Sequence, residues 1–210
     1  MRWIAGIDEV GAGALAGPIV VAAVAFPVPR EQSLENWWPI EVQDSKKYKS
    51  HKARLSARDS IVDFLLEVGG EIGISVAHAE AMNELDHQSV YMQAMADAAS
   101  EVTVQKSIFP ETLIVDGIQR ITYPYNQRTE KKADARFAHV AMASVIAKTT
   151  RDEFMISLAK RYSHYGWDSN MGYFTDQHIT ALMQHGHTRW HRRKACLTAK
   201  RNYRRRTKYG

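Results

Sequence analysis

Cysteine is nearly absent from this chain of 210 residues, and its single cysteine, Cys196, cannot form an internal disulfide. Nothing therefore indicates a secreted, cross-linked scaffold, and a reducing compartment is favoured. Long apolar runs are also missing, because no stretch approaches the roughly 18 uninterrupted apolar residues of a membrane span. Asp8 and Glu9 interrupt the N-terminus before the core of a signal peptide could form. We therefore expect a cytoplasmic protein with no membrane partner.

The common short motifs for nucleotides and zinc are missing as well. The chain has no G-x-x-x-x-G-K-[ST] sequence, and the glycines after Asp8 do not match G-x-G-x-x-G, so neither a nucleoside triphosphate site nor a dinucleotide site is supported. Nine histidines are present, but His185 and His187 have no cysteine partner at zinc-finger spacing.

The composition is that of a globular protein with one unusual segment. Apolar residues make up 45% of the chain and charged residues 24%, which is enough apolar material for a sizeable core. Ten of the 28 basic residues lie in 189–210, where there is no Asp or Glu, and this leaves 18 basic against 23 acidic residues elsewhere. Such a basic tail points to a polyanion such as nucleic acid. The alternative is a terminus that only keeps the protein soluble.

The hydrophobic pattern predicts an α/β fold without internal repeats or long linkers. We expect strands over 3–7, 19–26, 71–76 and 112–115, and helices over 50–68, 82–104, 137–162 and 175–185. A helical, basic C-terminal extension follows the last of these helices.

Four acidic residues lie at the ends of predicted elements. Asp8 and Glu9 stand where the first strand meets a glycine-rich turn, Asp116 closes a short apolar strand, and Asp134 precedes the longest helix. Adjacent acids on a strand point to opposite faces, so only one of the first pair can be the main inward ligand. Each acid alone could simply cap a helix or turn. Together, converging carboxylates repel one another unless cations such as Mg²⁺ or Mn²⁺ neutralise them, and two such ions can promote phosphodiester cleavage.

A set of short motifs makes the chain recognisable. In order, they are G-I-D-E-V-G at 6–11, L-A-G-P at 15–18, D-S-K-K at 44–47, V-D-G at 115–117, A-S-V-I-A-K-T-T-R-D at 143–152, G-Y at 172–173 and H-R-R at 191–193. From about residue 3 to residue 195, the chain resembles type 2 ribonuclease H, specifically bacterial ribonuclease HII. The resemblance implies a ribonuclease H-like fold, a mixed β-sheet flanked by helices. It places the catalytic domain at 1–162 and a helical C-terminal region with the basic tail at 163–210.

The resemblance also implies the roles of individual residues. It makes the four acids the catalytic and metal-binding carboxylates for Mg²⁺ or Mn²⁺, with Asp8 bridging both ions. Lys46 and Lys47 would contact phosphates, Tyr173 would pack against the sugar at a ribonucleotide junction, and Ser144 and Lys148, one helical turn apart, would face the duplex backbone. The turn of Gly11, Ala12 and Gly13 would bring backbone amides to a 2′-hydroxyl.

Some positions depart from the family pattern. Ala12 stands where the family usually has an arginine, Met171 where a lysine is common, Ala14 where a proline is usual, and Ala133 where a glycine precedes the fourth acid. Two cations expected near the substrate are therefore absent, which weakens the selection of a single ribonucleotide embedded in DNA.

We accordingly expect a monomeric endoribonuclease that hydrolyses the RNA strand of RNA–DNA hybrids and leaves a 5′-phosphate. We expect it also to cut at ribonucleotides embedded in DNA, with weakened selectivity. Two alternatives stay open at this point. One is a related nuclease of the same superfamily that acts on branched DNA, and the other is a hybrid- or RNA-binding protein with weak turnover.

Overall fold

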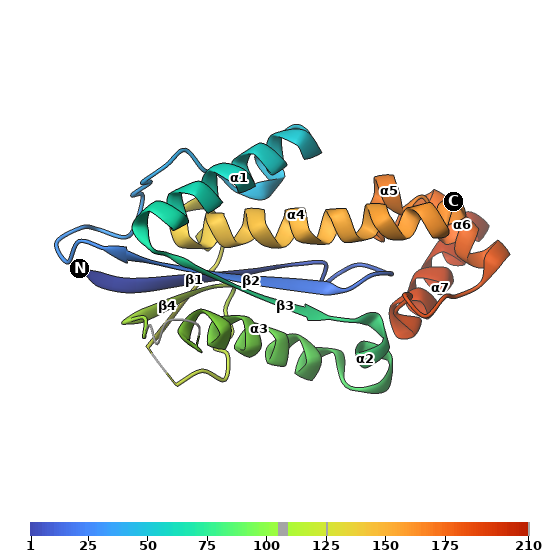
Figure 1. Ribbon diagram of the computed structural model, residues 1–210. Helices are drawn as coiled ribbons and strands as arrows, with labels where there is room; N and C mark the ends of the chain where they lie inside the picture. Colours follow the sequence, from blue (N-terminus) through green and yellow to red (C-terminus); the bar gives the residue numbers. More distant parts are fainter. Residues whose placement is uncertain (105–108, 125, 210) are drawn as a thin grey trace. The chain divides into compact units, whose positions relative to one another are not determined.

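The computed structural model describes residues 1–104, 109–124 and 126–209 (Figure 1). Its secondary-structure elements follow one another along the chain in this order: β1 (Arg2–Val10), β2 (Ile19–Val28), the 3₁₀ turn η1 (Ser45–Lys47), α1 (His51–Val68), β3 (Glu71–Ala77), α2 (Ala79–Glu84), α3 (His87–Val104), β4 (Thr112–Asp116), β5 (Gln127–Glu130), η2 (Ala133–Ala135), α4 (Ala138–Arg161), η3 (Ser163–Tyr165), α5 (Trp167–Asn170), α6 (Asp176–His185) and α7 (Arg193–Tyr209).

The chain forms two compact units. Unit 1 contains Met1–Val10, Val20–Val76 and Met92–Thr149, and unit 2 contains Gly11–Ile19, Ala77–Tyr91 and Thr150–Gly210. Each unit is assembled from segments that are distant in sequence. The division of the chain at residue 162 into a catalytic domain and a C-terminal region stays a prediction.

Unit 1 is built on a mixed sheet with the strand order β3-β2-β1-β4-β5. β1 pairs antiparallel with β2 and parallel with β4, and β4 pairs parallel with β5. The predicted mixed sheet flanked by helices is thereby confirmed. β5 lies outside the predicted strands because its sequence, Q-R-T-E, contains no apolar residue. It is an edge strand, so it need not bury both faces.

Helices cover the two faces of this sheet, with α1 and α4 on one face and α3 on the other (Figure 1). α4 packs directly on β1 at Gly6, where an added Cβ would lie 2.5 Å from the backbone of His139 and Val140. Glycine at this position therefore permits the close approach of helix and strand. The apolar core formed there includes Ile4, Val24, Phe26, Ile114, Phe137, Val140 and Val145.

Helix boundaries follow the capping residues. Ser50 accepts a hydrogen bond from the Ala53 amide at 3.1 Å and begins α1, and Gly69, with φ 71°, ends it. The expectation of one helix over 82–104 is wrong, because the chain forms α2 and α3 instead. Asp86 separates them by accepting a hydrogen bond from the Ser89 amide at 2.9 Å, which caps the start of α3.

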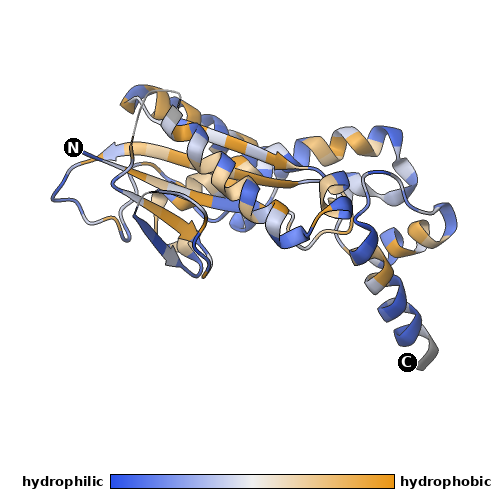
Figure 2. Cartoon of the chain, turned by 90° about the horizontal axis from the view of Figure 1, so that it is seen from below, coloured by the Kyte–Doolittle hydropathy of each residue, from blue (hydrophilic) through white to orange (hydrophobic). Residues whose placement is uncertain are grey.

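Unit 2 contains the Gly11–Ile19 turn and the C-terminal helices. The predicted cap at Thr175 is confirmed, since its hydroxyl accepts from the His178 amide at 3.1 Å at the start of α6. The predicted helical form of the basic extension is also confirmed: α7 is hydrophilic over most of its length (Figure 2) and packs Cys196 and Ala199 into an apolar cluster. Among the described helices, none combines the length and the apolarity that crossing a membrane requires.

His139 of α4 is a buried group that acid should protonate only in the unfolded chain. Its ring stacks on Phe26 at 3.6 Å, and burial lowers the pKa of His139 to about 3. The unfolded chain therefore binds a proton near pH 6.5 that the folded chain does not, so stability falls as the pH drops below 6.5.

We expect this group to remove about 1.2 kcal/mol of unfolding free energy between pH 7 and pH 5.5. Urea unfolding at both pH values should show this loss in the wild type, and His139→Phe should reduce it by that amount. A matched variant at an exposed histidine, His87→Phe, should retain the loss. Equal pH dependence in His139→Phe and the wild type would contradict the assignment.

Candidate active site

Two carboxylates lie at the same ends of the central parallel strands. The pairing of β1 with β4 runs to Ile7 and Val115, and Asp8 and Asp116 are the next residues of the two strands. Asp8 is buried, with 6% of its surface exposed. Burial, the neighbouring Glu9 and then Asp116 raise the pKa of Asp8 well above its usual range, against a hydrogen bond from Ser144. The charged form of Asp8 is thus less favourable in the folded protein than in water.

Glu9 follows Asp8 on β1, opposite Val21 of β2, whereas Asp8 lies opposite Ala22. The Glu9 amide donates to Asp8 Oδ1 at 2.7 Å. Glu9 is half-buried and Asp8 is buried, as expected for successive side chains that leave a strand on opposite faces.

The third and fourth carboxylates are joined through η2. The Ala133 amide donates to Asp116 Oδ1 at 2.8 Å, and Asp134 is the next residue. Burial, followed by the charges of Asp44 and Asp116, raises the pKa of Asp134, and Lys46 opposes them. The fixed contact between Asp116 and η2 therefore places Asp134 in the field of the other acids.

The D-S-K-K motif forms η1 and contributes to the same site. Asp44 accepts a hydrogen bond from the Lys46 amide at 2.9 Å and caps the turn. Ser45 and Ser144 are both buried, with their hydroxyl oxygens 3.0 Å apart, and Ser144 also bonds Asp8. The D-S-K-K motif is therefore held, through Ser45, against Ser144, which is the residue that hydrogen-bonds Asp8.

Lys46 supplies the positive charge in this group. Burial lowers the pKa of Lys46, but the carboxylates of Asp44, Asp8, Asp134 and Asp116 together raise it above its usual value. Lys46 thus remains charged at neutral pH among four acids. The sequence motif identified Lys46 and Lys47 but gave no role to Asp44 or Ser45, because Asp44 acts on Asp134 and Ser45 meets Ser144, both far along the chain.

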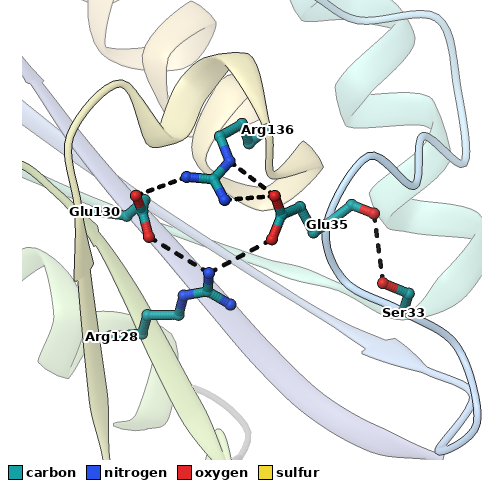
Figure 3. Close-up of polar contacts among 5 residues, drawn as sticks. All are labelled: Ser33, Glu35, Arg128, Glu130 and Arg136. Carbon is teal, nitrogen blue, oxygen red and sulfur yellow. Dashed lines mark hydrogen bonds and ion pairs between the residues drawn. The ribbon is translucent and has the colours of Figure 1, made fainter.

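An ion-pair network braces the segment that follows Asp134 (Figure 3). Arg136 donates through Nε to Glu35 at 2.9 Å and through Nη1 to Glu130 at 2.6 Å. Arg128 lies 3.5 Å from Glu35 and 3.4 Å from Glu130, which closes the ring of four charges. These side chains are partly exposed, so each pair stabilises only weakly. The network links β5, the end of η2 and the loop that carries Glu35.

The donor set of unit 1 fits a hard cation. Within the described residues, no group of three His, Cys, Asp or Glu side chains is arranged to hold a metal directly. Asp8 and Asp116 instead accept hydrogen bonds from the amides of Glu9 and Ala133. Burial is the main cause of the raised pKa values of Asp8 and Asp134, and the charges of neighbouring acids add to it. Clustered carboxylate oxygens are the donors that Mg²⁺ and Mn²⁺ prefer, and such a cation would neutralise them.

The remaining predicted substrate contacts divide between the two units. Lys47 and Lys148 belong to unit 1, while the Gly11–Gly13 turn and Tyr173 belong to unit 2. In unit 2, the Gly172 carbonyl accepts from the amides of Leu15 and Ala16 at 2.8 and 3.1 Å. The glycine-rich turn and the residue before Tyr173 are therefore hydrogen-bonded to each other.

One of two adjoining buried histidines, His178, holds the backbone of Tyr173. His178 Nδ1 lies 2.9 Å from the Tyr173 carbonyl and must donate to it, which leaves His178 Nε2 as an acceptor for Trp167 Nε1 at 3.1 Å. His191 Nδ1 accepts from the Thr188 amide at 2.9 Å, so His191 Nε2 carries the proton toward His178 Nε2, 3.3 Å away. Both rings are neutral in this arrangement.

Comparison with solved structures identifies the fold. Ribonuclease H2 from Pyrococcus horikoshii OT3 superimposes with a TM-score of 0.73 over 97% of this chain and 99% of that chain, at 22% identity. Bst-RNase HIII in complex with Mn²⁺ gives a TM-score of 0.63 over 95% of this chain and 71% of that one, at 20% identity. The chain has the ribonuclease H-like fold of these two proteins.

Sequence comparison gives the family. Residues 5–200 match the family model of ribonuclease HII. Ribonuclease HII from one strain of Bacillus cereus is 36% identical over 193 residues, which are 92% of this chain and 68% of that protein. The chain belongs to the ribonuclease HII family. It is a ribonuclease H, an endonuclease that hydrolyses RNA in RNA–DNA hybrids.

Proposed function

We propose that Asp8, Glu9, Asp116 and Asp134 hold Mg²⁺ or Mn²⁺ and form the catalytic centre for hydrolysis of the RNA strand. The observation that carries this proposal is the placement of Asp8 and Asp116 directly after the last paired residues of β1 and β4, with Asp134 next to the Ala133 amide that donates to Asp116. The Mn²⁺ complex of Bst-RNase HIII supports the choice of metal. Bound ions of this kind lower the pKa of a water and stabilise a leaving oxygen.

Residues around the acids orient them. The amide of Ala133 fixes Asp116, and the hydroxyl of Ser144, itself bonded to Ser45, fixes Asp8. Ser144 is 2% exposed, so we assign it to the orientation of Asp8 and not to the duplex surface. Lys46 holds its proton among the acids and is available to a phosphate oxygen once metal neutralises them.

The direct test uses the purified protein with Mn²⁺ or Mg²⁺ and end-labelled RNA–DNA, RNA–RNA, DNA–DNA and branched DNA duplexes. We expect cleavage within the RNA strand of the hybrid, with 5′-phosphate ends on the downstream fragments, and no cleavage after chelation. Cleavage of branched DNA without hybrid cleavage would favour a different nuclease of this fold. Hybrid binding without turnover would favour a binding protein. The monomeric state stays a prediction that light scattering can test.

The proposed substrate range includes ribonucleotides embedded in DNA, with reduced selectivity. Ala12 is half-exposed and carries no charge where the family usually has an arginine. Recognition of one ribonucleotide depends on contacts with one sugar and its adjacent phosphates, whereas a long hybrid offers many equivalent positions.

Ala12→Arg should therefore raise cleavage of a duplex with one ribonucleotide more than cleavage of a long hybrid, changing the ratio of kcat/KM by about fivefold or more. Ala12→Gln adds a side chain without charge and should leave that ratio near the wild-type value. If Ala12→Arg affects both substrates equally, the charge of this turn does not govern selection.

A further inference from the structure

Two arginines are buried beneath the glycine-rich turn of unit 2. Arg151 of α4 is 0% exposed, and Arg192, just before α7, is 3% exposed. Buried arginines normally pair with carboxylates, because an isolated charge is costly to remove from water. The hydrogen bonds of these guanidinium groups go to backbone carbonyls instead.

Most of those carbonyls belong to the turn. Arg192 donates to the Ala12 carbonyl at 2.8 Å through Nη1, and to the Gly17 carbonyl at 3.2 and 3.0 Å through Nε and Nη2. Arg151 donates to the carbonyls of Pro18 at 2.9 Å and Ala16 at 3.1 Å. The two planar, charged guanidinium groups thus bind four backbone carbonyls of one short segment.

The amides of the same turn point elsewhere. Within the described part of the chain, the amides of Ala12 and Gly13 have no hydrogen-bond acceptor, and a Cβ added at Gly13 would meet open space. Gly11 has φ +100°, and its Cβ would lie 2.2 Å from Arg151 Nε, so only glycine fits this approach to the guanidinium. The carbonyls therefore face the arginines, while two amides stay available to an acceptor from outside.

Arg151 also supports Tyr173. Its guanidinium carbon lies 5.1 Å from the centre of the Tyr173 ring, and its Nη1 donates to the Met171 carbonyl at 2.8 Å. The Gly172 carbonyl in turn accepts from the amides of Leu15 and Ala16. One buried side chain therefore contacts both the turn and the half-exposed Tyr173.

The arrangement has an electrostatic cost. Burial, with the nearby charge of Arg151, lowers the pKa of Arg192 to about 9. Arginine keeps its proton at neutral pH, so both charges lie next to the turn whose Ala12 and Gly13 amides have no acceptor among the described residues. Such a charge strengthens amide binding of a phosphate or hydroxyl oxygen. Ala12 contributes no cation of its own.

We propose that Arg151 and Arg192 are positioning residues that hold the Gly11–Pro18 turn and Tyr173 in the conformation that recognises a single ribonucleotide. This inference rests on the proposed recognition of embedded ribonucleotides, with the turn and Tyr173 as the expected substrate contacts. Neither arginine touches the reacting atoms. Their loss should weaken recognition and leave the chemical step largely intact.

The test compares Arg192→Gln and Arg192→Lys with Arg161→Gln, which removes an exposed arginine of unit 2. For a duplex with one ribonucleotide, Arg192→Gln should raise KM by about tenfold or more and change kcat by less than about threefold. KM for a long hybrid should change by less than about threefold, because many registers compensate. Arg192→Lys keeps the charge but loses the planar guanidinium group, so its KM for the duplex with one ribonucleotide should lie between those of Arg192→Gln and the wild type. Arg161→Gln should match the wild type.

Fluorescence anisotropy in EDTA separates this inference from the proposed catalysis. The wild type should bind the ribonucleotide-containing duplex more tightly than the all-DNA duplex, and Arg192→Gln should lose that preference. If the wild type cleaves nothing yet shows the preference and the variant loses it, the proposed catalysis fails and the positioning role stands. If Arg192→Gln and Arg192→Lys retain wild-type melting temperatures and wild-type ratios, the positioning role is overturned. If Arg192→Gln unfolds, the preference for the ribonucleotide-containing duplex is measured in Arg192→Lys instead. A wild-type preference in Arg192→Lys then overturns the positioning role, and a reduced preference supports it.

Discussion

Asp116→Asn should lower hybrid cleavage by about 10³-fold or more while the protein stays folded, a loss equivalent to about 4 kcal/mol of transition-state stabilisation. Asparagine preserves the shape of the side chain and can still accept the hydrogen bond from the Ala133 amide. What it removes is the negative charge needed to hold a cation beside Asp8. The loss should therefore fall on kcat and on metal dependence, with little effect on the affinity for hybrid.

Asp134→Asn extends this prediction to stability. The pKa of Asp134 is raised in the folded protein, so its charged form opposes folding at neutral pH, above the pKa of the unfolded chain. The neutral asparagine should leave the metal-free thermal midpoint unchanged or raise it, while cleavage collapses. Added Mn²⁺ should stabilise the wild type more than either variant.

Cleavage, thermal midpoint and the Mn²⁺ concentration for half-maximal activity should be measured on the same preparations. Asp63→Asn, an exposed acid on α1 of the same unit, is the matched control and should behave as the wild type. Near-normal cleavage in Asp116→Asn would refute the metal assignment. A large drop in thermal midpoint would instead show that Asp116 is a structural residue.

The positions of the acids could be predicted because they depend on local patterns. Asp8 and Asp116 each end an apolar strand segment, and parallel neighbours bring such ends together. The starts of helices α1 and α6 could also be predicted, because the side chains of Ser50 and Thr175 cap amides only three residues further along the chain. Strand β5 and the break between α2 and α3 at Asp86 were not predicted, because neither changes the hydrophobic periodicity of the sequence.

The contacts that arrange the site could not be predicted from local patterns. Arg192 bonds the Gly17 carbonyl 175 residues away, Arg136 bonds Glu35 101 residues away, and Ser45 meets Ser144 across 99 residues. In the sequence, each is an ordinary polar residue in a polar or helical context. Only the fold shows that Arg151 and Arg192 are buried. The motifs thus predict the chemistry of the site, and long-range packing supplies its geometry.

The basic helix α7 should provide much of the affinity for nucleic acid without taking part in the chemistry. Three of its arginines, Arg201, Arg204 and Arg205, are exposed and lie at positions i, i+3 and i+4 on one side of the helix. Its other side is structural, since Ala199 and Tyr203 pack with Leu15 and neighbouring apolar residues. A truncation after residue 198 would remove the exposed arginines and the apolar contacts of α7 together. Substitution of the arginines alone separates their charge from the packing of the helix.

The triple variant Arg201→Gln, Arg204→Gln and Arg205→Gln should keep the fold, because none of these side chains is buried. Arg206 is left in place because it pairs with Asp176 at 2.7 Å. If all three arginines contact phosphates, the slope of log affinity against log salt should flatten by roughly 2–2.7.

KM at 0.1 M salt should rise at least about tenfold, with little change in kcat. A triple variant of exposed cations elsewhere, Lys52→Gln with Lys160→Gln and Arg161→Gln, controls for net charge and should keep the wild-type slope. A tail that only maintains solubility predicts an unchanged slope and KM with readier precipitation. Hybrid binding measured at several salt concentrations distinguishes these outcomes, because only direct phosphate contacts change the number of counterions released.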